Sequence, residues 1–225
     1  SYDYAWDVAI SKTSEIYVIG TAGGDIGTTS GLGGDDGFVT KYDKNGNQQW
    51  LKFYGSTSSD SFYGVILNPK GGLYALGFSD GPIGTIGDTS PTGTNYDATI
   101  TKISADGTQV WVNEFGTDGY DNPQNGAIGP DGRLYVGGIT RGAFTGYTHA
   151  GGTYDAFVYA INSDGTNAAV RQFATAGSDG NYTYTIGLTL RPNGTIVIGT
   201  QGDKAPWGAG TPASGDIFLT AIPKL

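Results

Sequence analysis

The fold is decided by a short segment, Asp36-Gly37-Phe38-Val39, that returns three more times along the chain. Its copies are Asp97-Ala98-Thr99-Ile100, Asp155-Ala156-Phe157-Val158 and Asp216-Ile217-Phe218-Leu219, at intervals of 61, 58 and 61 residues. Self-similarity at a fixed period is the signature of a repeat architecture. The sequence therefore predicts four repeats, at approximately residues 1–57, 58–118, 119–176 and 177–225.

Two more segments recur in step with this one and divide each repeat into strands. The first is Ile16-Tyr17-Val18-Ile19-Gly20, with counterparts beginning at Leu73, Leu134 and Ile196; the second begins at Trp50, with counterparts at Trp111 and Ala169. Turns such as Asn68-Pro69-Lys70-Gly71 and Ser104-Ala105-Asp106-Gly107 suit hairpins, because glycine accepts positive φ. In the second repeat we expect strands near 64–67, 73–78, 98–103 and 109–115.

Four successive antiparallel strands, repeated four times, predict an all-β fold. Radial repetition of such sheets gives a β-propeller, so we expect one four-bladed propeller domain over residues 1–225. The fourth repeat has no counterpart of the last strand, since the sequence given stops at Leu225 after the third. We therefore expect fifteen strands and a three-stranded last blade, or else a piece of a longer array.

These motifs resemble the SBBP-type bacterial β-propeller repeat. The resemblance covers almost the whole chain; it is strong in the first two repeats, fair in the third and weak in the fourth. It implies a bacterial, usually exported β-propeller that is often part of a larger surface protein. It brings no catalytic residues.

Composition excludes several classes of function. The net charge of −9 argues against nucleic acid and anionic lipid as partners, because both favour basic surfaces. No apolar run reaches the length of a membrane-spanning helix. The absence of cysteine excludes disulfides and thiolate chemistry. An acidic chain rich in Gly, Thr and Tyr, with no Met, is what we expect of a secreted or cell-surface protein.

Four repeated aspartates, Asp36, Asp97, Asp155 and Asp216, precede the third strand of each repeat, at the end of a long Gly-rich loop. Carboxylate oxygens are ligands for hard cations, so one hypothesis is a Ca²⁺ site. The alternative is that each carboxylate accepts backbone N–H groups and holds its own loop. We favour the second interpretation, because no Asp-rich EF-hand pattern is present.

The same long loops contain large apolar or aromatic residues and the single histidine: Ile26, Ile83, Phe144, Tyr147, His149 and Trp207. Apolar side chains among glycines usually anchor a loop to the core. The alternative is an exposed platform for a glycan or a peptide, for which Phe144, Tyr147 and Trp207 are the best candidates. Trp6, Trp50 and Trp111 are expected to be structural.

No asymmetric pair of acid and base stands out, and no nucleophile motif is present, so we do not expect an enzyme. A carboxylate-based glycosidase is the remaining catalytic possibility. Two non-catalytic hypotheses stay open. The first is a structural module of a surface layer, filament or larger exported protein; the second is a lectin-like or adhesin-like module that binds through the long loops.

The last predicted strand is the expected contact for assembly. Without a fourth strand beside it, its backbone is open to pairing with a neighbouring subunit or with further chain. Its residues are Asp216, Ile217, Phe218, Leu219, Thr220, Ala221 and Ile222.

Overall fold

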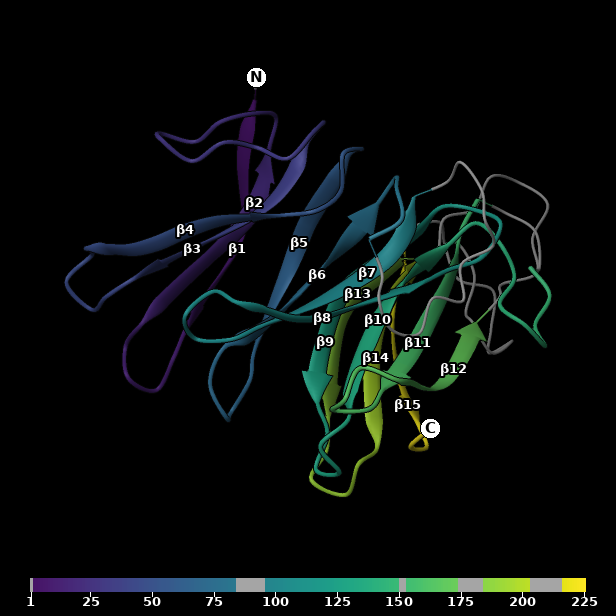
Figure 1. Cartoon of the computed structure of the whole chain (residues 1–225). Helices are drawn as coiled ribbons and strands as arrows, with labels where there is room; N and C mark the ends of the chain where they lie inside the picture. Colours follow the sequence, from purple (N-terminus) through teal and green to yellow (C-terminus); the bar gives the residue numbers. More distant parts are fainter. Residues whose placement is uncertain (1, 84–95, 150–152, 174–183, 203–215) are drawn as a thin grey trace. The chain divides into compact units, whose positions relative to one another are not determined.

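The computed structural model describes residues 2–83, 96–149, 153–173, 184–202 and 216–225, which form fifteen β-strands and no helix (Figure 1). The part of the chain it describes accordingly has no helix that could span a membrane. The strands make four antiparallel sheets, in which each strand pairs with its neighbours in sequence. Two compact units result: residues 1–88 with 96–115, and residues 116–225 with 89–95.

The first unit contains two four-stranded sheets. The strands of the first sheet are β1 (Asp3–Ile10), β2 (Ile16–Ala22), β3 (Asp36–Tyr42) and β4 (Gln48–Tyr54). Those of the second sheet are β5 (Asp60–Leu67), β6 (Leu73–Ser79), β7 (Asp97–Ile103) and β8 (Gln109–Phe115).

The second unit contains a four-stranded and a three-stranded sheet. The strands of the third sheet are β9 (Asp121–Ile128), β10 (Leu134–Thr140), β11 (Asp155–Ile161) and β12 (Asn167–Phe173). The fourth sheet consists of β13 (Tyr184–Leu190), β14 (Ile196–Gly202) and β15 (Asp216–Ile222).

The all-β prediction is confirmed, and the described residues contain the fifteen strands that we expect. Aromatic side chains at equivalent positions of the repeats are buried: Tyr17, Tyr74 and Tyr135 in the second strands, and Phe38 and Phe157 in the third strands. One boundary differs, because β5 begins at Asp60 rather than near residue 64. A β-bulge at Tyr63 interrupts the alternation of side chains there, so the first half of the strand does not show the regular pattern.

Each unit has its own apolar core between its two sheets. In the first unit the core includes Tyr17, Ile19 and Val39 from the first sheet and Phe62 and Leu73 from the second. In the second unit Tyr135 and Val158 pack with Leu188, Ile196 and Ile198. Full burial of such a side chain stabilises the fold by about 1.5–3 kcal/mol. The cores therefore hold neighbouring sheets face to face within each unit.

The same irregularity occurs in the first strand of every sheet. The register shifts by one residue at Trp6 in β1, Tyr63 in β5, Gln124 in β9 and Ile186 in β13. A glycine of the second strand lies beside the bulge: a Cβ on Gly20 would overlap the carbonyl oxygen of Tyr4, and one on Gly77 that of Ser61. The glycine is required because the bulged backbone passes directly over it.

Candidate functional site

In the described residues, the long connections leave and enter the strands at one end of each sheet, and the short hairpins lie at the other. In the first unit we call the first the loop end (connections 23–35 and 55–59, with residues 80–83 and 96) and the second the turn end (hairpins 11–15, 43–47, 68–72 and 104–108). The sequence pointed to the loop end as the functional face. In the structure, buried carboxylates and aromatic rings lie at the loop end, and a pocket and lysine side chains lie at the turn end.

Buried carboxylates accept hydrogen bonds that fix the backbone of the loop end. Asp36 is fully buried, and its Oδ2 accepts the N–H groups of Leu32 at 2.6 Å and Gly33 at 3.3 Å. Asp60 Oδ2 accepts both the N–H (2.6 Å) and the hydroxyl (3.0 Å) of Ser56. Burial raises the pKa of Asp60. These carboxylates hold backbone in place, as the anchoring interpretation describes.

The second unit repeats this arrangement. Asp121 Oδ2 accepts the N–H of Thr117 at 2.7 Å and its hydroxyl at 3.0 Å, as Asp60 does with Ser56. Asp155 Oδ2 accepts a hydrogen bond from Gln172 Nε2 at 2.8 Å. The repetition from sheet to sheet indicates a scaffold function for these acids.

The proposed calcium ligands begin four different strands. Asp36, Asp97 and Asp155 are buried at the starts of β3, β7 and β11, and Asp216 begins β15. Within the described ranges, no three His, Cys, Asp or Glu side chains are grouped as a metal site. Calcium binding stays a prediction without a described cluster to support it.

Two of the apolar loop residues are held by the last strand of their own sheet. Phe144 is buried against Phe157 and Tyr159, and its N–H donates to Gln172 Oε1 at 2.9 Å. The N–H of Ile83 donates to Glu114 Oε2 at 3.1 Å. Ile26, half-buried, closes a small loop through two 3.0 Å hydrogen bonds with Thr29. These contacts describe anchors rather than a platform.

The other candidates of the lectin-like hypothesis differ in exposure. Tyr147 is partly exposed, and its hydroxyl donates to the carbonyl oxygen of Val170 at 3.0 Å. His149 is half-buried. Trp207 lies outside the described residues. The glycan platform on the long loops stays a prediction, with Tyr147, His149 and Trp207 as its remaining candidates.

A row of aromatic rings at the loop end of the first unit was not predicted from the sequence. Successive ring centroids are 4.6–6.4 Å apart. Its members are Tyr2, Tyr4, Trp6, Tyr63, Phe78 and Tyr96. Tyr2 is 81% exposed, and Tyr4 and Trp6 are about half exposed. The alternation of Tyr2, Tyr4 and Trp6 is visible in the sequence, but their exposure is not.

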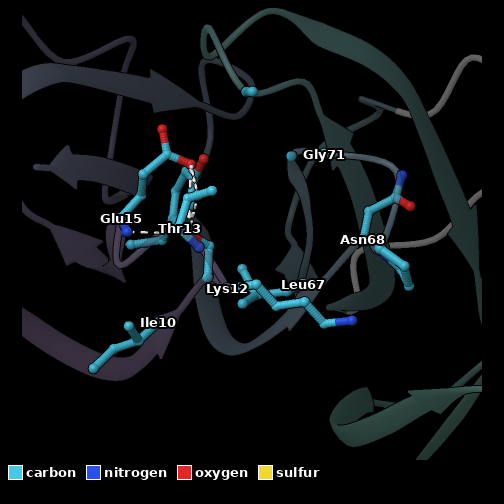
Figure 2. Close-up of a pocket in the computed structure, with 12 residues that line it drawn as sticks. Ile10, Lys12, Thr13, Glu15, Leu67, Asn68 and Gly71 are labelled. Atoms are coloured by element: carbon cyan, nitrogen blue, oxygen red, sulfur yellow. Dashed lines mark hydrogen bonds between the residues drawn. The ribbon is translucent and has the colours of Figure 1, made fainter. Parts of the chain in front are cut away.

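A pocket of about 440 Å³ opens at the turn end of the same unit. Figure 2 shows Thr13 and Glu15 on one wall, Asn68 and Gly71 on the other, and Lys12 between them. The walls are the hairpins that join β1 to β2 and β5 to β6. Because both hairpins belong to the first unit, the pocket is a property of that unit alone.

The one carboxylate of the pocket is already paired. Glu15 Oε1 lies 2.6 Å from Lys41 Nζ, and its Oε2 accepts the hydroxyl of Thr13 at 3.2 Å. The hydrogen bond from Lys41 lowers the pKa of Glu15. Lys12, by contrast, is exposed and has no ion pair in the described part of the chain. The pocket therefore presents a positive charge.

This charge is part of a wider segregation in the first unit. All six basic side chains of its described residues lie at or reach the turn end: Lys12, Lys41, Lys44, Lys52, Lys70 and Lys102. Eight acids lie at the loop end, four of them exposed (Asp3, Asp25, Asp35 and Asp80) and four buried (Asp36, Asp60, Asp97 and Glu114). The two ends of the unit thus have opposite charge.

Strand β15 is an open edge in the described sheet. It pairs with β14 on one side, and among the described residues no strand pairs with its other side. Leu219 is 80% exposed and Ala221 is exposed as well. The side chains of residues 216–218 are not described.

No protein-family model matches the sequence, and no curated protein sequence does. Among solved structures, a protein of unknown function from Bacteroides caccae is 11% identical, with a TM-score of 0.45. The alignment covers 93% of this chain and 58% of that one, so the chain spans less than two thirds of this neighbour. A thermostable family-43 glycoside hydrolase is also 11% identical, with a TM-score of 0.41 and coverage of 96% and 92%. The resemblance to SBBP-type repeats rests on the sequence motifs.

Proposed function

We propose that this chain is a non-catalytic assembly module of an exported or cell-surface protein, built as a four-bladed β-propeller. The observation that carries the assembly function is the open, apolar edge of β15. An edge of this kind is a template for another strand, and natural sheets protect such edges with charges, proline or bulges. In β15 the described side chains are Leu219, Thr220, Ala221 and Ile222, and none is charged.

The propeller is supported by the equivalence of the four sheets. Each has its strands in sequence order, and each has its bulge at the same place in the first strand. Within each unit, the first strand of the later sheet contacts the first two strands of the sheet before it: β5 contacts β1 and β2, and β13 contacts β9 and β10. Contacts of this kind are expected between successive blades of a propeller, and they support the proposal.

The non-catalytic part of the proposal is supported by the acids. Asp36, Asp60 and Asp121 accept hydrogen bonds from backbone N–H groups, which holds their loops. A catalytic pair needs two carboxyl groups in different environments. Here Asp60 and Asp121, at equivalent positions of two sheets, have the same hydrogen-bond environment.

A labelled peptide of residues 107–117, which contains the β8 sequence, tests the edge directly. This is the fourth strand of a complete sheet, so it should add to β15 and slow amide exchange over Asp216–Ile222. Leu219→Lys should weaken this binding at least about tenfold, because a lysine on an edge strand opposes pairing. Val110→Lys, at an exposed position of the complete second sheet, is the matched control.

The two possible results of the exchange experiment have opposite consequences for the proposal. Slower exchange that depends on Leu219 supports strand addition. Unchanged exchange at saturating peptide, or equal binding by the Leu219→Lys variant, overturns the assembly function for this edge. The sheet would then end at three strands without a partner.

A further inference from the structure

The two ends of the first unit have opposite charge, and the side chains that carry this charge do not belong to β15. Its turn end carries three exposed lysines, Lys12, Lys44 and Lys70. None of them makes an ion pair in the described structure. The long-range field of such a surface attracts a partner of opposite charge.

The acids of the turn end offset only part of this charge, since six lysines lie at or reach this end and three acids, Glu15, Asp43 and Asp106, lie there. Glu15 is paired with Lys41. Asp43 accepts the N–H groups of Asn45 and Asn47 in its own hairpin, and Asp106 does the same for Thr108. Hydrogen bonds from Ser104 and Thr108 lower the pKa of Asp106 to about 2. Each carboxylate is thus committed to its local turn.

The loop end has the complementary surface. Asp3, Asp25, Asp35 and Asp80 are exposed there, and this end of the unit has no basic residue in its described part. The exposed rings of Tyr2, Tyr4, Trp6 and Tyr96 belong to the aromatic row at the same end of the unit. Tyrosine and tryptophan are enriched at the centres of protein interfaces, and their ring faces attract lysine ammonium groups.

The chain already uses this lysine–aromatic contact internally. Lys41 Nζ lies 5.4 Å from the ring centroid of Tyr17, and Lys102 Nζ lies 5.7 Å from the centroids of Tyr74 and Trp111. The turn end of a second copy would bring Lys12, Lys44 and Lys70 to rings of the same kind.

We infer that the basic turn end of one copy docks on the acidic, aromatic loop end of another. The pocket between hairpins 11–15 and 68–72 provides a recess on the basic side. Because the two surfaces are at opposite ends of the same sheets, the contact is heterologous and head-to-tail, and it can propagate into a filament. It uses neither edge of β15, so it is independent of strand addition.

The test is a charge swap followed by sedimentation velocity. At about 20 mM salt the wild-type chain should self-associate with increasing concentration, and at about 0.5 M salt it should do so much less, because salt screens exposed charges. Lys12→Glu combined with Lys70→Glu should weaken association at least about tenfold. The loop-end variant Asp35→Lys with Asp80→Lys should weaken association by a similar factor. Neither aspartate side chain makes a hydrogen bond in the described structure, so the substitutions should leave the fold intact.

A mixture of the two charge-reversal variants gives the strongest test of the contact. The reversed turn end of one should bind the reversed loop end of the other and restore a heterodimer, which neither a folding defect nor a change of net charge could do. Trp6→Ala should weaken association at both salt concentrations, whereas Tyr147→Ala, in the other unit, should not. Leu219→Lys should leave it intact, which separates this contact from the β15 edge. Monomers at every concentration in low salt, or a mixture that does not associate, would overturn the inference.

Discussion

The indole N–H of Trp50 donates a hydrogen bond to the carbonyl oxygen of Ala105 at 3.3 Å, which joins the last strand of the first sheet to the last hairpin of the second. Lys52 Nζ donates to the carbonyl of Asp106 at 3.1 Å, and the hydroxyl of Tyr54 donates to that of Gly107 at 2.8 Å. Three side chains of β4 thus hold three successive carbonyl groups. Packing and polar contacts act together to fix this hairpin against the first sheet.

The Tyr54 contact is the most buried of the three, so its removal should be measurable. Tyr54→Phe leaves the carbonyl of Gly107 without this donor and should lower the free energy of unfolding by about 1 kcal/mol. Tyr42→Phe is the control, because the Tyr42 hydroxyl has no hydrogen bond in the described structure. Urea denaturation of both variants measures the difference. Equal stability of the two would contradict a stabilising role for the contact.

The glycine beside each bulge gives a second prediction. In Gly77→Ala the new Cβ would overlap the carbonyl oxygen of Ser61, which is backbone and cannot move aside cheaply. We expect a loss of about 3 kcal/mol in the free energy of unfolding. Gly187→Ala is matched, since no described atom lies within 4 Å of a Cβ there and its φ is not in the left-handed region. A Gly77→Ala variant as stable as Gly187→Ala would show that the bulge relaxes freely.

The strands were predictable because the sequence contains four copies of one pattern, which can be compared with one another. Leu73-Tyr74-Ala75-Leu76-Gly77 is a strand by composition, and its counterparts at the same spacing remove the ambiguity. The bulge at Tyr63 was not predictable, because it is defined by pairing with β6 rather than by local sequence. The pocket at Lys12 was missed for a similar reason: it needs two hairpins that are far apart in the chain and adjacent in space.

Asp60 should make stability depend on pH in a direction opposite to that of most carboxylates. Burial raises its pKa in the folded state above the ordinary aspartate value of 3.8, so the folded protein binds this proton more tightly than the unfolded chain does. Protonation therefore stabilises the fold as pH falls through the raised pKa toward 3.8. Above that window the ionised, buried carboxylate costs stability.

The comparison with Asp60→Asn isolates this effect from other acids. Asparagine cannot titrate but can still accept the N–H of Ser56 through its side-chain oxygen. The stability of the wild type relative to the variant should rise as pH is lowered from 7 to about 4. Chemical denaturation at each pH gives the two curves. A difference that is constant with pH, or that falls on acidification, would contradict the raised pKa.

The proposed closed ring of four blades can be tested at Val8. Val8 and Ile10 lie on the face of the first sheet opposite to the Tyr17 and Ile19 core, since Val8 pairs with Val18 and Ile10 with Ile16. Both side chains are more than half exposed in the described structure. In a closed propeller a neighbouring blade would cover this face. Val8→Lys would then bury an unpaired ammonium group, which should lower the free energy of unfolding by more than about 2 kcal/mol.

In an open arrangement the same substitution stays at the surface and should change stability by less than about 0.5 kcal/mol. Val110→Lys provides the reference, because Val110 is similarly exposed on β8, the outer strand of a complete sheet. Thermal and urea unfolding of the two variants decide between the arrangements. A large loss for Val8→Lys with none for Val110→Lys supports ring closure through the apolar face of β1, because only a covering sheet can make a lysine at position 8 costly. Equal, small effects would mean that this face is free in solution and that the four sheets do not close into a ring.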